Sequence, residues 1–556
     1  MKETQVQVLV IGGSLVGLSA AMFLAQRGVR TLSVEKHRGT AIHPRAGYFQ
    51  LRTMELMRYA GIQDRVRAAA LALYDADGGM NAVETLEGKE IANYIPNINY
   101  GVQDVTPARR LFMPQQVLEP LLLERAREFG AKFEYSTELV GFEQDAEGVT
   151  ATVRDIDTKD ERRIRAQYIV SCDGNRSPVR EKLGIPMIGH SQMSRSVTIY
   201  FRADCSHALR GRNLGVIYVT NPQVRGFFRL EKTGLGGFLV VFTVGDINEP
   251  GARYAADGIT TARAVELVRA AVGDQNLEVS VESVDKWNAV AQTAEVFQQG
   301  RIFIAGDAAH TMPPTGGFGG NTGIQDAHNL AWKLALVVQG VAGPELIDTY
   351  NAERQPAGYQ AVEQAYNRYV LRSDPDLGTE GMHAAVPDMH VEFNRYRSSA
   401  VVHEDGFEDD GKLDIDPRHS RALPGTRAPH VELSQSGTAV STLDLVGINF
   451  ILMTGHDGAG WHSPVAAAGG KFGIKIECHQ VLRAASQGGL VDLHGDHAVP
   501  FCAQYGIEPS GAVLVRPDGY VAWRATAFSP EKAERFAEVL GKVLSRPVHA
   551  QAGVAA

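Results

Sequence analysis

The sequence predicts a mixed fold, α/β combined with α+β, and three features of the chain predict it. Residues 6–35 read as a strand, a glycine-rich turn, a helix and a second strand. Residues from about 185 to 285 contain short strands of alternating polarity, and a loop-rich connection precedes the final part of the chain. Because 556 residues are several times the usual domain size, we expect two or three domains.

The composition is that of an ordinary globular protein, with 44% hydrophobic and 21% charged residues. A net charge of −9 argues against binding to nucleic acid or to an anionic membrane surface, since such proteins usually carry a basic excess. The widely spaced Cys172, Cys205, Cys478 and Cys502 fit neither a disulfide framework nor a zinc site. No window approaches the ~20 apolar residues that span a bilayer. We therefore expect a cytoplasmic protein without a metal ion, whose partners are small molecules.

The opening stretch VQVLVIGGSLVGLSAAMFLAQRGVRTLSVEK is the predicted βαβ unit. Apolar residues between Leu18 and Ala25 recur at helical spacing, and Gly28 is placed to end the helix before the second strand. The turn between the first strand and the helix, GGSLVG, is close to the G-x-G-x-x-G pattern, with Ser14 in place of the middle glycine. This pattern indicates a Rossmann-like domain.

A dinucleotide is the ligand that such a turn favours. The helix N-terminus presents free N–H groups and a positive dipole end to a phosphate. Glu35, roughly 20 residues further on, stands where an acid binds ribose hydroxyls and disfavours a 2′-phosphate. The alternative is a tight turn without a ligand, but the order of strand, turn, helix, strand and acid favours the dinucleotide. The residues that we expect to contact it are Gly12, Ser14, Leu15, Val16, Gly17, Glu35 and Lys36.

Two further stretches distinguish between a nicotinamide and a flavin. QYIVSCDGNRSPVREKLG places Asp173 directly after a short apolar strand, and RIFIAGDAAH places Asp307 after another. With the βαβ turn, the DGNRSPVR segment and the GDAAH segment in this order, the chain resembles the FAD-dependent aromatic hydroxylases, in their phenol hydroxylase and aromatic polyketide hydroxylase branch. The resemblance covers roughly residues 6–354 and implies bound FAD, whereas a nicotinamide dehydrogenase would explain only the first motif.

The resemblance implies roles for single residues. Asp307, at the carboxyl end of a strand, would accept hydrogen bonds from the ribityl hydroxyls of the flavin, and its alternative role is a helix cap. Asp173 would lie near the site where NAD(P)H approaches, or would simply form an Asx turn. Arg45 and Gln115 match an arginine and a glutamine that flank FAD in the family; without the resemblance they are a loop charge and the start of a helix.

The glycine-rich stretch TGGFGGN precedes a periodic helix that we expect to begin at Asn321. Reduced flavin carries negative charge around N1, which backbone N–H groups at a helix N-terminus can stabilise. By resemblance, the amides of Gly320 and Asn321 contact that edge of the flavin. The other residues that we expect in this part of the site are Gly317 and Gly319 in the same loop, and Pro313 and Pro314 in the wall where oxygen reacts.

The family's reaction uses FAD, NADPH or NADH as a transient reductant, and O₂ as a co-substrate. Reduced flavin and O₂ form a C4a-hydroperoxide, whose terminal oxygen is transferred to an electron-rich aromatic carbon, and the protein must keep the peroxide dry. Because the chain carries one dinucleotide fingerprint, NAD(P)H is expected to visit the site transiently, and NADPH is preferred by family habit alone.

The substrate is expected on the strands SVTIYF, LGVIYV, RGFFRL and GGFLVVFTV, which predict an antiparallel sheet with one face toward the flavin. Tyr218, Phe227 and Phe228 would line an aromatic cavity, or would be ordinary core residues. Tyr218 and Arg372 align with substrate-contacting positions of polyketide hydroxylases, where Arg372 would hold a phenol as its phenolate. We expect His43 and His310 to be structural rather than general bases.

The last third of the chain follows a connection rich in Asp, Gly and Pro. NFILMTG and FGIKIECHQV read as strands, GAVLVRPDGYVAWRA as a hairpin, and Ser529-Pro530 as the start of a helix. This part resembles the thioredoxin-like C-terminal domain of the same branch, without paired redox cysteines, so we expect a structural or interface role and a possible homodimer. The predicted domains are a Rossmann-like FAD-binding domain in two parts (1–184 and 286–395), a substrate-binding antiparallel sheet domain (185–285) and the thioredoxin-like domain (396–556).

We predict an aromatic monooxygenase that hydroxylates a phenol, preferably a polycyclic, polyketide-like one, because the fullest resemblance is to that branch. A simple phenol remains open, as does a Baeyer–Villiger or rearranging oxidation on the same scaffold. A third hypothesis is a flavin-binding partner protein without turnover.

Overall fold

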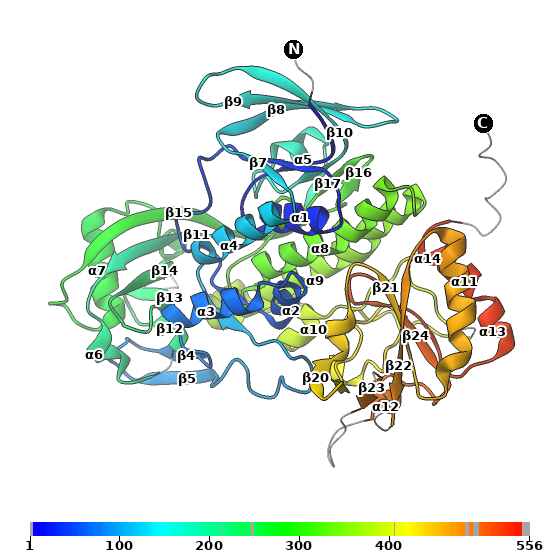
Figure 1. Ribbon diagram of the computed structural model, residues 1–556. Coiled ribbons are helices and arrows are strands. Elements are labelled where there is room, and N and C mark those ends of the chain that lie inside the picture. Colours follow the sequence, from blue (N-terminus) through cyan, green and yellow to red (C-terminus); the bar gives the residue numbers. More distant parts are fainter. Residues whose placement is uncertain are drawn as a thin grey trace.

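Three large β-sheets and one two-stranded sheet organise the described residues in this computed structural model (Figure 1). The structure describes residues 4–212, 214–245, 250–404, 406–483, 489–492 and 500–546. No helix within these ranges is long and apolar enough to cross a membrane. Each large sheet has a hydrophobic core on at least one face. The sheets therefore mark the parts of the chain that fold around separate cores.

The first sheet brings the ends of its parallel strands to one edge. β1 pairs in parallel with β2 and β10, and β10 pairs in parallel with β17, so that Ile11, Val34, Ser171 and Ile304 lie in register. The residues that follow these strands consequently meet at the same edge, and the predicted βαβ unit is confirmed. The strands are β1 (Thr4–Ile11), β2 (Thr31–Val34), β7 (Lys132–Glu134), β8 (Thr137–Gln144), β9 (Val149–Asp155), β10 (Glu161–Ser171), β16 (Gln298–Gln299) and β17 (Ile302–Ile304).

Helices cover this sheet and share its core. Nearly all of α1 is buried, because it packs between the sheet and α4 and α8. α8 begins at Phe318, three residues earlier than predicted, because the αL turn at Gly317 already directs the chain into the helix. The helices are α1 (Leu15–Gln26), α2 (Leu51–Tyr59), α3 (Gln63–Leu73), α4 (Gln115–Glu128), α5 (Pro178–Lys182), α8 (Phe318–Val338), α9 (Asp348–Arg372) and α10 (Asp388–Glu392).

The second sheet contains the four strands predicted for the substrate side, and also strands from elsewhere in the chain. β4 and β5 come from the first 184 residues, and β4 pairs with β12 in parallel, so the sheet is not wholly antiparallel. α7 (Thr261–Val272) and α6 (Ser206–Leu209) pack on one face. The strands are β4 (Gly79–Val83), β5 (Glu90–Ile95), β11 (Met187–Arg202), β12 (Leu214–Thr220), β13 (Val224–Leu230), β14 (Gly236–Val244), β15 (Ser280–Ala294) and β18 (His310–Thr311). A small sheet of β3 (Tyr48–Phe49) and β6 (Leu111–Phe112) is not hydrogen-bonded to it, although Tyr48 and Phe112 pack in the same core cluster.

The third sheet forms the C-terminal part, with strand order β20-β19-β23-β22-β21-β24-β25. The predicted strands and hairpin are confirmed, and the predicted last helix is divided at Arg535 into α13 and α14. Cys478 and Cys502 are free thiols, and burial raises the pKa of both. The elements are β19 (Glu432–Gln435), β20 (Thr438–Ser441), β21 (Phe450–Thr454), β22 (Ile476–Leu482), β23 (Leu490–Asp492), β24 (Ala512–Val515), β25 (Val521–Ala525), α11 (His462–Phe472), α12 (Phe501–Gln504), α13 (Pro530–Glu534) and α14 (Phe536–Val543).

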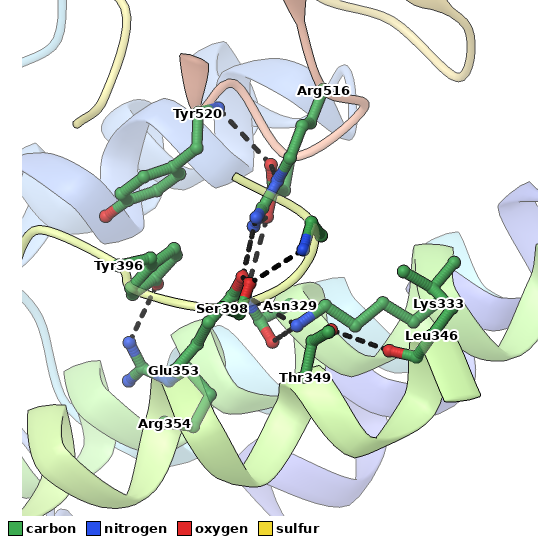
Figure 2. Close-up of polar contacts among 12 residues, drawn as sticks. Asn329, Lys333, Leu346, Thr349, Glu353, Arg354, Tyr396, Ser398, Arg516 and Tyr520 are labelled. Carbon is green, nitrogen blue, oxygen red and sulfur yellow. Dashed lines mark hydrogen bonds and ion pairs between the residues drawn. The ribbon is translucent and has the colours of Figure 1, made fainter. Parts of the chain in front are cut away.

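A buried network of charges joins this C-terminal part to α8 and α9 (Figure 2). Arg516, in the β24–β25 turn, donates from Nη1 to Glu353 Oε1 at 2.6 Å and from Nη2 to Glu353 Oε2 at 2.9 Å. Lys333 Nζ donates to the same Oε2 at 2.7 Å. Asp518 accepts a hydrogen bond from Trp332 Nε1 at 3.1 Å. The C-terminal part is thus anchored to α8, whose N-terminal end contacts the segment after β17, and to α9, which packs on β15 of the second sheet.

Candidate active site

A cavity of about 1980 Å³ lies between the carboxyl edge of the first sheet and one face of the second. The N-terminal turns of α1 and α8, the segment 36–48 and strands β11 to β15 line it. The predicted site residues that line this cavity are Gly12, Ser14, Leu15, Val16, Glu35, Lys36, Arg45, Gln115, Asp173, Tyr218, Asp307, Pro314, Gly317, Gly319 and Gly320. Gly17, Asn321 and Arg372 are outside the lining.

The turn before α1 needs glycine at two positions. Gly12 has φ +105°, and a Cβ there would lie 2.3 Å from the carbonyl oxygen of Cys172. A Cβ on Gly17 would lie 1.9 Å from the carbonyl oxygen of Gly12, so Gly17 sets the close approach of the helix to the strand without facing the cavity. Ser14 has extended backbone angles (φ −95°, ψ −171°) that any residue adopts. The serine in the glycine pattern therefore costs the turn nothing in backbone strain.

Glu35 closes the same turn from the end of β2. Its Oε2 accepts a hydrogen bond from Gly13 N at 2.6 Å, and its Oε1 accepts one from His37 N at 2.8 Å. The carboxylate lines the cavity beside the first turn of α1. This is the position where an acid can bind ribose hydroxyls, and the backbone bonds hold it there.

Glu119 organises this corner of the site and was not among the predicted residues. Ser14 Oγ donates to Glu119 Oε1 at 2.7 Å, and Gln115 Nε2 donates to the same oxygen at 2.6 Å. Glu119 Oε2 accepts from Ala41 N at 2.5 Å, while Gln115 Oε1 accepts from Ala46 N at 3.2 Å. Two residues one turn apart on α4 thus tie the α1 turn to the segment 41–46. The available signal was this i, i+4 spacing after the predicted Gln115.

Asp307 and Asp173 present carboxylates at the sheet edge. The carboxylate of Asp307 faces the cavity and accepts no hydrogen bond from the described residues, so the alternative role as a helix cap has no support. Desolvation by the surrounding protein raises the pKa of Asp307, while His310 and Arg45 lower it. Asp173 Oδ2 accepts from Val179 N at 3.2 Å, and its buried Oδ1 has no partner among the described residues. These unpaired acceptors suit a ligand with hydroxyl groups.

The first turn of α8 supplies backbone donors. Gly319 and Gly320 are the second and third helical residues, whose N–H groups have no acceptor within a helix, and both line the cavity. Asn321 is the fourth, where a regular helix begins to bond internally. Its side chain is buried and donates to the carbonyl oxygens of Tyr48 at 2.9 Å and Gly317 at 2.7 Å. The Asn321 side chain thus holds the loop, and a contact between its amide and the flavin stays a prediction.

Val16 keeps the two helix N-termini together. A Cβ on Gly306 would lie 2.7 Å from Val16 Cγ2, and a Cβ on Gly323 would lie 2.5 Å from the same atom. The valine therefore fills a notch between two glycines, one at the end of β17 and one in α8. Both positive dipole ends consequently open into one cavity, where they favour negative charge.

The face of the second sheet that lines the cavity is largely aromatic and apolar. Tyr218 lies opposite Phe227 in the β12–β13 register, and both line the cavity. Phe228 packs on the opposite face, in the core under α7, so of its two predicted roles it has that of an ordinary core residue. Successive residues of a strand point to opposite faces, and Phe227 and Phe228 could not both face the cavity.

Two arginines lie near this wall, and only the unpredicted one reaches the cavity. Arg372 lies outside the lining, with its Cζ 5.1 Å from the centroid of the Tyr94 ring and 6.0 Å from that of Tyr218. A role for Arg372 at the substrate thus stays a prediction and would act through Tyr218. Arg229, on β13, lines the cavity and is 5% exposed.

The two histidines occupy different environments. His43 lines the cavity and stacks on Tyr200, with ring centroids 5.0 Å apart. His310 is buried outside the lining, with Nε2 2.7 Å from Asp326 Oδ2. Although burial opposes it, Arg354 and His310 hold the pKa of Asp326 below its ordinary value. Because Asp326 also accepts from Gly306 N at 3.1 Å, His310 belongs to the support of the loop that carries Asp307.

Comparison with known proteins finds relatives that align with nearly the whole chain. A family model described as FAD binding domain matches residues 5–365, and one described as aromatic-ring hydroxylase, C-terminal, matches residues 421–547. The chain is 46% identical over 549 residues to a 4-methyl-5-nitrocatechol 5-monooxygenase of Burkholderia sp, covering 98% of each chain. It is 35% identical over 576 residues to a tetracenomycin A2 monooxygenase-dioxygenase of Streptomyces glaucescens, covering 100% of each. A ternary complex of aklavinone-11 hydroxylase with FAD and aklavinone aligns with a TM-score of 0.90 and 36% identity, over 98% of this chain and 100% of that one.

Proposed function

The chain belongs to the FAD-dependent aromatic-ring hydroxylases, and from this premise we propose that it hydroxylates a phenolic ring in the cytoplasm with NADPH or NADH and O₂. The observation that carries the proposal is one continuous cavity with two chemically different ends. One end has helix N-termini and unpaired carboxylates, and the other has an aromatic wall. Its volume of about 1980 Å³ is roughly twice the upper range of ordinary ligand pockets, which suits a dinucleotide beside a substrate.

The residues at the first end fit FAD. The α1 turn would receive the pyrophosphate, Glu35 the adenosine ribose, and the free carboxylate of Asp307 the ribityl hydroxyls. The amides of Gly319 and Gly320 would stand at the negatively charged edge of the reduced ring. When bound, FAD supplies the transfer of electrons from NAD(P)H to O₂. Arg45 and Pro314 line the part of the cavity between this end and the aromatic wall.

The phenol has two candidate sizes. A polycyclic, polyketide-like phenol is favoured by the tetracenomycin and aklavinone enzymes among the relatives and by the roomy cavity. A one-ring nitrocatechol is favoured by the higher identity, 46%, to the nitrocatechol monooxygenase. Product mass and connectivity separate hydroxylation of either from a Baeyer–Villiger or rearranging oxidation.

The test is stimulated, product-coupled oxidation of NADPH and NADH by the FAD-loaded protein. The panel contains phenol, 4-methyl-5-nitrocatechol, tetracenomycin A2 and aklavinone, with O₂ uptake and product mass as readouts. We expect at least one phenol to accelerate NADPH oxidation and to yield a product with one added oxygen atom. A colourless protein that takes up no FAD would refute the proposal. Oxidation that no phenol stimulates would instead favour a flavin-binding partner protein.

The division of the chain into domains belongs to the same proposal. We assign the split FAD-binding domain to 1–184 and 286–395, the substrate domain to 185–285 with the added strands β4 and β5, and a thioredoxin-like domain to 396–556. The last of these carries no cysteine pair among its described residues and would serve structure or a homodimer interface. Light scattering on the purified protein tests the homodimer.

A further inference from the structure

Arg229 is a buried cation whose Nε and Nη1 have no hydrogen-bond partner among the described residues. The side chain belongs to β13, lines the cavity and is 5% exposed. A charged N–H donor that is buried without a hydrogen-bond partner costs free energy, because it has lost its bonds to water. Such a group is stable in the working protein when an anion from outside the chain completes it.

No carboxylate of the described residues neutralises this guanidinium. Desolvation lowers the pKa of Arg229, and the groups that offset it are the tyrosines at positions 48, 74 and 218. The Cζ of Arg229 lies 5.1 Å from the centroid of the Phe112 ring. Among the cavity-lining residues that β11 to β14 contribute in the described chain, Arg229 is the charged one, and the others are Thr198, Tyr200, Val216, Tyr218, Phe227, Phe238 and Val240.

The guanidinium stands at the flavin end of this wall. A Cβ on Gly47 would lie 1.7 Å from Arg229 Nη1, so the glycine leaves the space that the guanidinium occupies. The next residue, Tyr48, packs on Gly317, where a Cβ would lie 2.9 Å from Tyr48 Cδ1. Gly317 is the N-cap of α8, whose first turn faces the proposed flavin ring. Two consecutive residues, Gly47 and Tyr48, therefore lie between Arg229 and the first turn of α8.

We propose that Arg229, rather than Arg372, is the residue that binds the ionised hydroxyl of the aromatic substrate. The proposal rests on the proposed function and deepens it by naming the side chain that holds this oxygen. The O–H bond of the phenol breaks, its proton leaves to bulk water, and the electron pair stays on the oxygen beside the guanidinium. No oxidant or reductant enters this step. A phenolate ring is the more nucleophilic toward an electrophilic oxygen.

Arg229 fits this task better than Arg372. The Arg372 guanidinium is taken up by the rings of Tyr94 and Tyr218 and is absent from the cavity lining. Arg229 presents unpaired N–H groups and lines the cavity itself. A hydrogen bond from a guanidinium N–H group to an anionic oxygen is charge-assisted and therefore stronger than one between neutral groups.

The experiment is an absorbance titration of the FAD-loaded protein with 4-nitrocatechol, whose phenol and phenolate forms differ in colour. In the wild-type protein we expect the bound ligand to ionise at a lower pH than the free ligand. Arg229→Gln should weaken binding roughly 10-fold to 100-fold and raise the apparent pKa of the bound ligand by about one to two pH units. Arg229→Lys should recover part of the pKa shift. Arg225→Gln is the matched control, because Arg225 is on the same strand, half-buried and outside the lining.

Two further arms locate the interaction. 4-Nitroveratrole keeps the nitro group and has no ionisable hydroxyl, so Arg229→Gln should leave its affinity within about 2-fold of wild type. If Arg229→Gln loses FAD, Gly47→Ala provides a second route, because its Cβ displaces the guanidinium while the charge remains. It should raise the bound-ligand pKa in the same direction.

Several outcomes would overturn the proposal. These are an unshifted ligand pKa in the wild-type protein, failure of 4-nitrocatechol to bind it, equal losses for 4-nitroveratrole and 4-nitrocatechol, or a shift that Arg372→Gln removes and Arg229→Gln keeps. Failure of the proposed function looks different: phenols would bind as phenolates in an Arg229-dependent way, yet no phenol would stimulate NADPH oxidation. Conversely, turnover with an unshifted bound ligand in both proteins would refute Arg229 alone.

Discussion

Replacing Glu353 by glutamine should destabilise the protein far more than a typical charge removal. Glu353 is on α9, and its two oxygens accept from Arg516, Lys333, Asn329 and Ser398 at 2.6 to 2.9 Å. The side chains of Glu353, Arg516 and Lys333 are fully buried. Figure 2 shows the contacts that Glu353 makes with Arg516 and Lys333. The carboxylate is the centre that several separate segments share.

The magnitude follows from the charges left behind. The network holds two cations, Arg516 and Lys333, against two anions, Glu353 and Asp518. Glu353→Gln leaves one buried positive charge in excess, and breaking a buried pair in this way costs about 3–5 kcal/mol. Native domains are stable by about 5–15 kcal/mol, so the change removes a large share of the total. Replacing Glu353 and Arg516 together by Leu and Met keeps the charge balanced and should cost less than Glu353→Gln alone.

Urea unfolding followed by tryptophan fluorescence measures this effect. Trp332, Trp461 and Trp523 belong to the core that the C-terminal part shares with α8, and Trp332 bonds to Asp518. Glu345→Gln is the matched control, because Glu345 is exposed just before α9 and should change stability by less than ~0.5 kcal/mol. Equal free energies of unfolding for Glu353→Gln and Glu345→Gln would refute the reasoning, since the network would then be hydrated or open in solution.

The remaining predictions concern the flavin end and acid stability. Asp307→Ala should weaken FAD binding about 10-fold in a fluorescence titration while leaving the urea midpoint unchanged, and unaltered affinity would remove Asp307 from the ribityl site. Gly17→Ala should abolish FAD binding or folding because its Cβ meets the Gly12 carbonyl oxygen at 1.9 Å, whereas Gly470→Ala, with no atom within 4 Å, should retain both; normal FAD content in the first variant would contradict this. Pairing with Arg516 and Lys333 lowers the folded-state pKa of Glu353 despite burial, so stability is full above about pH 4.5 and falls as the pH decreases further; urea midpoints against pH should show a shallower acid loss in Glu353→Gln.

The elements of the fold were predictable where local pattern and tertiary contact agree. The βαβ unit, the four strands of the substrate side and the C-terminal hairpin all carry their own periodicity and turn residues. The start of α8 was misplaced because Gly317 in the αL conformation begins the helix, and glycine residues inside a first turn read as loop. β4 was missed as a member of the second sheet because its parallel partner β12 is more than a hundred residues away.

The site likewise contains residues that were predictable from the sequence and residues that were not. Gly12 in the α1 turn and the acids after β2, β10 and β17 follow from the rule that ligands bind at the carboxyl edge of a parallel sheet, and these residues do line one cavity, whereas Gly17 serves the packing of the turn. Glu119 could not be selected, because its importance comes from bonds to Ser14 and to Ala41, which are 105 and 78 residues away in the chain. Contacts between residues so far apart in the chain cannot be predicted from a local sequence pattern.

The two arginines show why the substrate end was the hardest part to read. A resemblance selected Arg372, which α9 places behind Tyr94 and Tyr218. In RGFFRL, strand alternation puts Arg229 on the same face as Phe227 and opposite Phe228, but the pattern cannot say which face meets the cavity. That choice is made by α7, which buries Phe228 and thereby turns Arg229 toward the cavity. Among the lining residues of β11 to β14, Arg229 is the charged one, with room cleared by Gly47; this is a feature that only the packed molecule reveals, and it implies that the substrate brings the missing negative charge.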